Sequence, residues 1–362
     1  MKIVFIADNV DGEKSGGVVS TKRFIEYLHK TDDLTVVSTG KKADKKIVFP
    51  AFYLPFAKKQ MQEMDFLFAW PNKKVLREAI QQADVVHIQF PFFLGYQAVK
   101  IAQQLNKPIV FGFHVQPENL MWNIGLDFEW LNKFLYRFFI RAFYSKGDLI
   151  FSPSAFGKIM LEKFQLKTPI EIVSNGLPEQ FAPKTCVRDV RFKDKFVILM
   201  VGRLAKEKRH RLVMEAIKQS QFKDQIQLVV TGDGALKEEL MALGDTLPNP
   251  AIFEYVSQEK LIELFNTADL FLHASDIELE GMAVLEAIGC GLPALISDSK
   301  QSASAQFALN EDFLFKAGDA DDVLAKIDYW IAHSEQLIAA KALYLEKAQQ
   351  YAFGACVEGA RE

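Results

Sequence analysis

The sequence predicts an α/β protein of two doubly wound domains that face each other across a cleft. The 362 residues are enough for two domains. Short apolar runs alternate with helix-length segments, as in repeated βαβ units with parallel sheets. One polar stretch interrupts this alternation. We therefore expect an N-terminal domain over 1–178, a linker over 179–195, a C-terminal domain over 196–345 and a helix over 346–362 that packs back on the N-terminal domain.

The strands of both domains are predicted from apolar runs that are each followed by helix-length sequence. In the N-terminal domain these runs are "KIVFIAD" (2–8), "LTVVST" (34–39), "DVVHIQF" (84–90), "PIVFGFH" (108–114), "DLIFSPS" (148–154) and "IEIVSN" (170–175). In the C-terminal domain they are "FVILMVGR" (196–203), "IQLVVTGDG" (226–234), "AIFEYV" (251–256), "LFLHAS" (270–275) and "PALISD" (293–298). Ligands of open α/β sheets bind beyond the carboxyl ends of the strands, so functional residues are expected in the loops there.

The composition excludes several classes of protein. No apolar run approaches the ~18 residues of a membrane span, and the start "MKIVFIADNV" indicates a first strand instead of a signal peptide. The three scattered cysteines form neither a disulfide framework nor a metal-ligand pattern, which favours a reducing cytoplasm. The net charge of −3 argues against a general nucleic-acid binder.

The charge is unevenly shared between the two halves. Residues 1–178 hold 23 Lys and Arg against 17 Asp and Glu, whereas residues 179–362 hold 20 against 29. The first half also holds 20 of the 31 phenylalanines. A basic, aromatic first half indicates contact with an anionic or apolar partner.

Two loops of the predicted sheets combine features that suit phosphate. Gly16 and Gly17 open a helix after the first strand, where free backbone N–H groups favour an anion, although the loop matches no dinucleotide or P-loop fingerprint. Arg203 and Lys208 follow the strand at 196–203, and two fixed cations suit a diphosphate. The alternatives are a plain βα turn at the glycines and solvated loop charges at the cations. His114 ends a strand, where a structural role and a substrate-binding or acid–base role are both open.

The segment "DIELEGMAVLEAIGCG" (276–291) places carboxylates around the start of an apolar helix. Glu278 lies beyond the strand at 270–275, Gly281 permits close backbone approach, and the helix that follows has free first-turn N–H groups. Glu286 lies little more than one turn into that helix. We expect Glu278 to stand by a sugar, the helix start by a diphosphate and Glu286 by ribose hydroxyls, as in a nucleotide-sugar site.

A basic and aromatic helix is predicted over 131–146. Lys133, Arg137 and Arg141 fall four residues apart and so share one stripe. Such a helix either rests on an anionic bilayer or is an ordinary domain helix with a core face. A second stretch of this kind, "AFYLPFAKK" (51–59), adds weight to the membrane alternative.

These residues together resemble the retaining glycosyltransferases of family four, which have the GT-B fold of two Rossmann-like domains. Glu278 and Glu286 match the E-x₇-E pattern of the family, and the resemblance covers nearly the whole chain. The supporting motifs are "VGRLAKEK", "TGDG", "YVSQEKLIELFNTADLFLHAS", "SNG" at 174–176 and the Gly-Gly loop. The segments "FHVQPENLMWNIGL", "WLNKFLYRFFIRAFY" and "SDSKQSASAQFALNEDFLF" are similar to a Gram-positive branch identified as diacylglycerol glucosyltransferases.

The resemblance implies roles for individual residues of this chain. Glu278, His114, Arg203 and Lys208 are expected at the reacting sugar and leaving group. The donor-binding set is expected to be Gly16, Gly17, Arg203, Lys208, Tyr255, Val256, Glu278, Gly281, Met282, Ala283 and Glu286, with Tyr255 and Val256 beside the base. No metal or other cofactor is expected, because the cations and the helix start would neutralise the diphosphate. Glu280 departs from the uncharged residue usual in the family; it either faces solvent or changes donor choice.

The expected activity is transfer of a hexose, glucose in the first instance, from a UDP-sugar to a hydroxyl acceptor. The expected acceptor is a membrane lipid such as diacylglycerol, with the protein in the cytoplasm and peripheral on the inner face of an anionic membrane. A polysaccharide, a protein-linked glycan or a soluble acceptor is the alternative. A non-catalytic nucleotide-sugar-binding protein is the alternative of another class.

Overall fold

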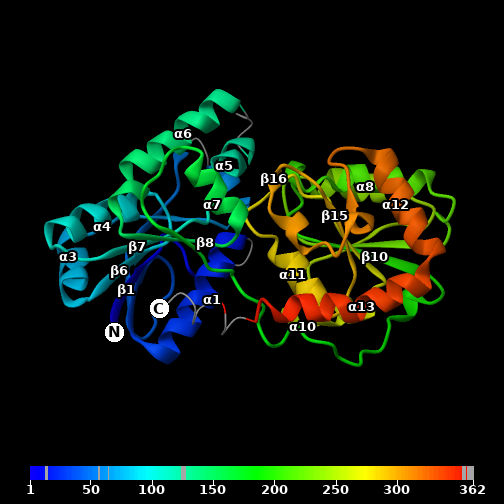
Figure 1. Ribbon diagram of the computed structural model, residues 1–362, viewed down its shortest axis with the longest axis horizontal. Helices are drawn as coiled ribbons and strands as arrows, with labels where there is room; N and C mark the ends of the chain where they lie inside the picture. The colour runs from blue at the N-terminus through cyan, green and yellow to red at the C-terminus, as the bar shows by residue number, and fades with distance from the viewer. Residues whose placement is uncertain (13–14, 56–57, 64, 124–127, 353–355, 357–362) are drawn as a thin grey trace. The chain divides into compact units, whose positions relative to one another are not determined.

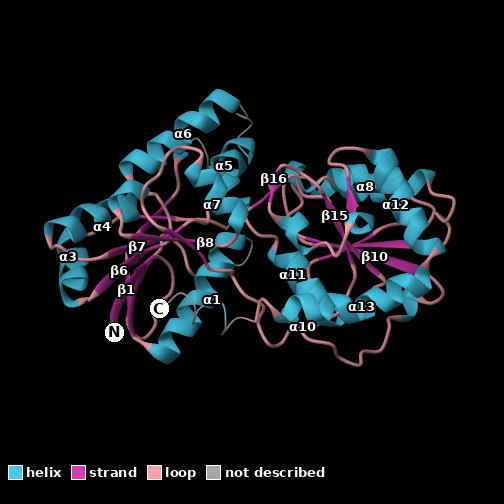
Figure 2. Ribbon diagram, viewed as in Figure 1, coloured by secondary structure: helices cyan, strands magenta, loops and turns pink. Residues whose placement is uncertain are grey.

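The computed structural model describes residues 1–12, 15–55, 58–63, 65–123, 128–352 and 356 (Figure 1). The chain divides into two compact units, the first comprising Met1–Asn175 and the second Gly176–Val357. Each unit contains one large parallel sheet with helices on both faces (Figure 2). None of the described helices is both long and apolar enough to cross a lipid bilayer.

The first unit is built on a seven-stranded sheet in the order β3-β2-β1-β6-β7-β8-β9, in which all neighbouring strands are parallel. Its strands are β1 (Lys2–Ile6), β2 (Asp33–Ser38), β3 (Lys46–Val48), β6 (Val85–Ile88), β7 (Ile109–Gly112), β8 (Leu149–Ser152) and β9 (Ile170–Ile172). A separate antiparallel pair joins β4 (Ala51–Phe52) to β5 (Phe68–Ala69). The central strands are nearly continuous apolar runs because helices cover both faces of the sheet.

The helices of the first unit connect these strands. They are α1 (Gly16–Thr31), α2 (Lys58–Glu63), α3 (Lys73–Gln82), α4 (Phe93–Gln104), α5 (Pro117–Asn123), α6 (Glu129–Ala142) and α7 (Ala155–Glu162), with a 3₁₀ turn η2 (Tyr144–Lys146). Side-chain caps begin two of them: Asn72 accepts from the backbone of the first turn of α3, and Ser154 from that of α7. These caps satisfy backbone N–H groups that a helix leaves unbonded at its start.

The second unit is built on a six-stranded parallel sheet in the order β12-β11-β10-β13-β15-β17. Its strands are β10 (Phe196–Val201), β11 (Ile226–Thr231), β12 (Ile252–Glu254), β13 (Leu270–His273), β15 (Ala294–Ser297) and β17 (Leu314–Phe315). Two short strands, β14 (Ile277–Glu278) and β16 (Gln301–Ser302), pair in parallel beside this sheet.

Helices cover both faces of the second sheet, with α8 and α12 on one face and α10, α11 and α13 on the other (Figure 1). The helices are α8 (His210–Gln219), α9 (Lys237–Gly244), α10 (Gln258–Thr267), α11 (Met282–Gly289), α12 (Ala320–Ala332) and α13 (Ser334–Gln349). The 3₁₀ turns are η3 (Val190–Phe192), η4 (Lys206–Lys208), η5 (Ser304–Phe307) and η6 (Glu311–Phe313).

Each strand predicted from the sequence overlaps an observed strand. The strands that the sequence did not reveal are β3, β4, β5, β14, β16 and β17, which have only two or three residues each. So short a run carries too little periodicity to distinguish it from a loop.

The segment 179–195, predicted as a linker, packs on the second unit. Phe181 and Phe192 are buried in its core, and Arg188 forms a bidentate ion pair with Asp269. The division between the units falls between Asn175 and Gly176, beside the predicted boundary at 178. Of the C-terminal helix predicted over 346–362, residues 346–349 belong to α13, and residues 353–355 and 357–362 lie outside the described part of the chain.

In each sheet the first strands are added one after another toward one edge, and the later strands start beside the first strand and are added toward the other edge. The point between these two groups is the topological switch point. In the first unit this switch point lies between β1 and β6, and in the second it lies between β10 and β13. Two loops diverge there at the carboxyl ends of the strands, so ligands of open α/β sheets bind at this point. The loops after β10 and β13 carry most of the residues predicted for the donor.

Candidate functional site

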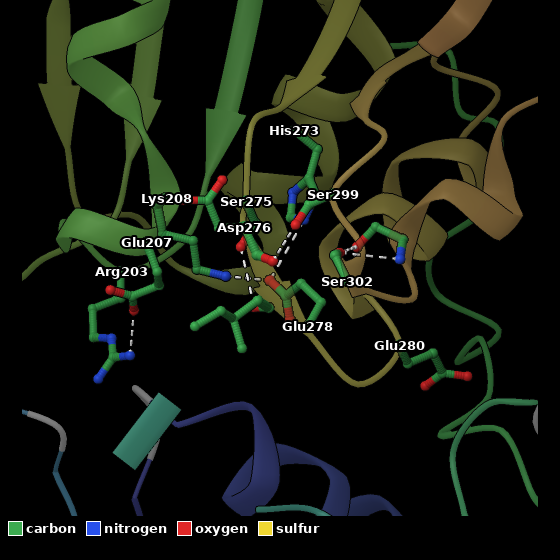
Figure 3. Close-up of polar contacts among 12 residues, drawn as sticks. Arg203, Glu207, Lys208, His273, Ser275, Asp276, Glu278, Glu280, Ser299 and Ser302 are labelled. Atoms are coloured by element: carbon green, nitrogen blue, oxygen red, sulfur yellow. Dashed lines mark hydrogen bonds and ion pairs between the residues drawn. The ribbon is translucent and has the colours of Figure 1, made fainter. Parts of the chain in front are cut away.

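The loop after β10 carries both predicted cations. Arg203 follows Gly202, and its guanidinium donates to Glu207 Oε1 at 2.5 Å. The Glu207 side chain is 2% exposed, so the arginine is held by a buried carboxylate (Figure 3). Charge-assisted bonds of this kind fix a guanidinium in orientation as well as in place.

Lys208 ends η4 and turns toward β14, where its ammonium is ion-paired with Glu278 Oε1 (Figure 3). His273, the last residue of β13, lies behind this pair with Nε2 at 3.5 Å from the same oxygen. Burial alone would raise the pKa of Glu278, but the Lys208 charge and the His273 ring outweigh it and hold that pKa well below its usual range. Glu278 is therefore ionised at neutral pH.

The start of α11 lies directly after this carboxylate. Gly281, which precedes the helix, has φ +97°, and a Cβ there would lie 2.4 Å from Ser304 Oγ. Only glycine fits this position without a shift. Gly281 is the N-cap residue of α11 and has no side chain to cap the helix, and Met282 and Ala283 form the first turn, with Glu286 little more than one turn further. A helix start carries a partial positive charge, so the predicted role of this one in binding an anion remains a prediction.

Two glycines, Gly232 and Gly234, let the loops after β10 and β11 lie backbone to backbone. A Cβ on Gly232 would lie 1.9 Å from the carbonyl oxygen of Gly202, and a Cβ on Gly234 would lie 2.5 Å from that of Leu204. Leu204 N in turn donates to Asp233 O at 3.0 Å. The "TGDG" motif therefore supports the loop that carries Arg203 and Lys208.

A polar network joins the loops after β10 and β13. The backbone N–H of Asp276 donates to Glu207 O at 2.8 Å, and the Asp276 side chain accepts from Arg209 Nε at 2.5 Å. Ser299 Oγ also donates to Asp276 O, at 2.6 Å (Figure 3). Arg209 has φ +52°, a left-handed conformation that disfavours any residue except glycine and is held here by the ion pair. This network fixes Lys208 against Glu278.

The structure corrects one interpretation of Glu280. Glu280 is only 2% exposed, so the expectation that it faces solvent is wrong. Its side chain lies apart from the Lys208–Glu278 pair (Figure 3), and its charge raises the pKa of Tyr351, which burial raises more strongly. The buried position is consistent with the other interpretation, a residue that affects donor choice.

Tyr255 and Val256 follow β12, which is separated from β13 by the two strands β11 and β10. Tyr255 is 57% exposed and Val256 is half-buried against the core of the unit. An exposed aromatic ring at the carboxyl edge of the sheet is suited to stack on a flat ligand.

The first unit holds the remaining predicted residues at its own carboxyl edge. Gly16 begins α1, and a Cβ on Gly17 would contact the Phe90 ring at 3.3 Å and His114 O at 3.6 Å. Ser20 Oγ donates to Asn175 Oδ1 and lies 3.5 Å from His114 Nδ1. Burial, and secondarily His87, lowers the pKa of His114 to about 3, so its ring is neutral at physiological pH.

Sequence reasoning missed the residues that hold the cations in place. Glu207 and Asp276 each adjoin a predicted residue or motif, but nothing in their spacing indicates that they meet in space. The sequence did offer a signal for His273, which is the one polar residue of the strand "LFLH". The structure shows that it is buried, with 4% of the residue exposed. Ser20 and Asn175 are separated by 155 positions, which no local pattern spans.

Two family models match successive parts of the chain. The model described as Glycosyltransferase Family 4 matches residues 14–181, and the model described as Glycosyl transferases group 1 matches residues 187–344. The chain belongs to glycosyltransferase family four. The two matched segments correspond closely to the two structural units.

Curated relatives of this glycosyltransferase resemble it at low identity. The sulfoquinovosyl transferase of Arabidopsis thaliana is 25% identical over 84% of this chain and 62% of that protein. The alpha-monoglucosyldiacylglycerol synthase of Streptococcus pneumoniae is 23% identical over 59% of this chain and 52% of that protein. A Campylobacter jejuni enzyme named as a diphospho-undecaprenol 4-alpha-N-acetylgalactosaminyltransferase is 30% identical over 50% of this chain and 49% of that protein. The matches span less than two thirds of the length of these relatives.

Solved structures show the fold of the family-four chain over its full length. The Anabaena protein HepE in complex with UDP and glucose matches with a TM-score of 0.76, at 16% identity over 100% of this chain and 98% of that one. Sucrose-phosphate synthase of Thermosynechococcus elongatus matches with a TM-score of 0.75, at 15% identity over 99% and 97%. The fold is GT-B, as the sequence predicted.

Proposed function

We propose that this chain is a retaining glycosyltransferase that moves glucose from UDP-glucose to the hydroxyl group of a membrane lipid such as diacylglycerol. The observation that carries the proposal is the arrangement at the switch point of the second unit. There Lys208, the ionised Glu278 and the start of α11 lie in or directly after the loops that follow the neighbouring strands β10 and β13. A cation and a helix start suit a diphosphate, and a carboxylate suits sugar hydroxyls.

The proposed reaction takes place on one face of the sugar. The bond between the anomeric carbon and the diphosphate oxygen breaks, and the acceptor oxygen forms a bond to that carbon from the same side. The acceptor proton passes to the leaving diphosphate oxygen, so UDP and a glycoside are the products. Arg203, Lys208 and the start of α11 would stabilise the negative charge that grows on the diphosphate.

Glu278 would position the sugar, with no covalent intermediate required. Glu286 would accept hydrogen bonds from the ribose hydroxyls, and Tyr255 and Val256 would lie beside the base. In the first unit, Gly16 and Gly17 would bind the donor and His114 would act at the reacting sugar. The proposal needs no divalent metal, because these cations and the helix end supply the positive charge.

The proposed acceptor and location draw on the names of relatives. Those names include alpha-monoglucosyldiacylglycerol synthases from two organisms. We place the protein in the cytoplasm, peripheral on the anionic inner face of the membrane. The Campylobacter relative, named for a diphospho-undecaprenol substrate, supports a second candidate acceptor, a polyprenyl-diphosphate-linked glycan.

A product assay that crosses donors with acceptors tests the proposal. UDP- and GDP-sugars are combined with diacylglycerol vesicles, a polyprenyl-diphosphate-linked glycan and soluble sugars, each with and without EDTA. Glucosyl-diacylglycerol of retained anomeric configuration, formed equally in EDTA, is the expected result. Product on the glycan alone overturns the lipid assignment. UDP binding without turnover of any pair indicates a non-catalytic nucleotide-sugar-binding protein.

A further inference from the structure

The exposed face of α6 is a ridge of aromatic side chains beside a row of cations. Trp130, Phe134 and Phe138 are 69%, 58% and 53% exposed. They are spaced four residues apart, so they follow one another along the helix surface for about 12 Å. Single exposed apolar residues are ordinary on a protein surface, but three large aromatic rings in one row mark a contact surface.

The opposite side of α6 provides the core face. Tyr136, Phe139 and Ile140 are buried, and the Tyr136 ring stacks on Phe164 at 4.8 Å between centroids while its hydroxyl donates to Glu118. The helix is therefore anchored to the first unit by one side only. The sequence left two alternatives, a helix that rests on an anionic bilayer and an ordinary domain helix with a core face. The structure shows a core face and an outward aromatic face on the same helix.

The cations lie along the edge of the aromatic ridge. Lys133, Arg137 and Arg141 are exposed and are also spaced four apart. Lys133 pairs with Glu129 at 2.5 Å, whereas no described carboxylate lies within ion-pair distance of Arg137 or Arg141. The exposed face of this helix thus combines bulky apolar side chains with an excess of positive charge.

We propose that the α6 face, defined as Trp130, Phe134 and Phe138 with Lys133, Arg137 and Arg141, docks on the surface of an anionic lipid bilayer. The aromatic rings would enter the headgroup region, where tryptophan is favoured, and the cations would pair with lipid phosphates. A second copy of the chain fits this face less well, because a symmetric contact brings Arg137 and Arg141 of both copies together.

The proposal deepens the proposed function, because a lipid acceptor requires the enzyme to reach a bilayer. Docking is nevertheless measured without donor or acceptor. A chain that docks but transfers nothing leaves the inference standing and removes the proposed function. A chain that glucosylates a lipid in detergent but does not bind vesicles leaves the proposed function standing and removes the docking inference.

The first measurement is co-sedimentation of the full chain with phosphatidylglycerol–phosphatidylcholine vesicles and with phosphatidylcholine vesicles. We expect binding to the anionic vesicles that weakens as salt is raised. Changing Lys133, Arg137 and Arg141 together to Gln should reduce binding by at least tenfold, since each cation contributes about fivefold. The matched control changes Lys218, Lys223 and Lys341 of the second unit to Gln, which removes the same charge and should leave binding nearly intact.

A second measurement locates the rings. Tryptophan emission of the wild-type chain should shift to shorter wavelength with anionic vesicles, and the Trp130→Phe variant should lose most of that shift while it still sediments. Changing Trp130, Phe134 and Phe138 together to Ser should abolish sedimentation without altering the circular dichroism spectrum.

Three results would overturn the docking proposal. The first is no binding of the wild-type chain to anionic vesicles at low salt. The second is equal binding by the α6 variants and the control. The third is a self-association of the wild-type chain that the Ser variant abolishes while vesicle binding persists.

Discussion

The Lys208 ammonium is ion-paired with the Glu278 carboxylate, although the two residues are 70 positions apart in the chain. They meet because β10 and β13 are neighbours in the sheet and the loops after both strands leave the same edge. Each residue is the counter-ion of the other. A diphosphate that takes Lys208 as its partner must therefore compete with Glu278, which frees that carboxylate for the sugar.

Replacing either member of this pair should remove most transfer. We expect Lys208→Ala and Glu278→Ala to lower the turnover of UDP-glucose by on the order of 10²- to 10³-fold, because each removes a charge at the reacting centre. Initial rates of UDP release in the presence of acceptor measure this. Arg211→Ala, which breaks an exposed ion pair with Glu239, is the control and should retain a near-normal rate. Near-normal rates in either site variant would contradict the assignment.

Glu207 is predicted to act through Arg203. The Glu207→Gln variant keeps the size of the side chain but weakens its hold on the guanidinium, so Arg203 should meet the diphosphate in a less fixed position. We expect KM for the donor to rise by about tenfold with a smaller change in kcat. Steady-state kinetics measure KM and kcat separately. The control is the Glu239→Gln variant, which changes an exposed glutamate in the same way. A large fall in kcat at unchanged KM would assign Glu207 a different role.

Asp8 should make the stability of the protein depend on pH. Burial raises the pKa of this carboxyl from 3.8 to about 7, although backbone hydrogen bonds from Ala69 and neighbouring residues oppose the rise. The unfolded chain ionises above pH 3.8 whereas the folded protein resists ionisation, so this contribution to stability is full below pH 3.8 and is lost as the pH rises to about 7.

The Asp8→Asn variant tests this dependence, because its side chain cannot ionise. We expect its free energy of unfolding to exceed that of the wild type by an amount that grows from pH 4 to pH 7 and reaches at most about 4 kcal/mol. Urea unfolding at several pH values gives the difference. Asp33→Asn, at an exposed carboxylate whose pKa Lys45 lowers, should show no such gain. A difference that does not change with pH would refute the prediction.

Two glycines with positive φ should respond very differently to alanine. Gly232 has φ +155° and no room for a Cβ, which would lie 1.9 Å from Gly202 O, whereas Gly318 has φ +76° with no atom within 4 Å. Gly318→Ala should cost about 1–2 kcal/mol from backbone strain alone. Gly232→Ala should cost clearly more and weaken UDP binding, because it displaces the loop that carries Arg203.

Thermal unfolding and UDP titration of the two glycine variants provide the comparison. Equal melting temperatures would mean that the backbone contact between the loops after β10 and β11 contributes little. Loss of UDP affinity in Gly318→Ala would show that the effect is not local to that contact.

The α6 helix shows where the sequence left a choice that structure settled. The four-residue spacing of Lys133, Arg137 and Arg141 is visible in the sequence, and so is the helix itself. Which aromatic residues enter the core is not, because Phe138 and Phe139 are adjacent and equally apolar. Packing of the Tyr136 ring of α6 on Phe164 sets the rotation of the helix, which buries Phe139 and leaves Phe138 exposed.

The sequence by itself determined the two doubly wound domains, their longer strands and the loops that follow those strands, because βαβ repetition is a local pattern of apolar runs and helix periods. It also determined the family, through residues close together in the chain such as Glu278 and Glu286. Only the tertiary structure decided that Lys208 pairs with Glu278, that Glu207 holds Arg203 and that Glu280 is buried. Those relationships depend on strand order and loop packing, and these bring together residues whose separation along the chain carries no local signal.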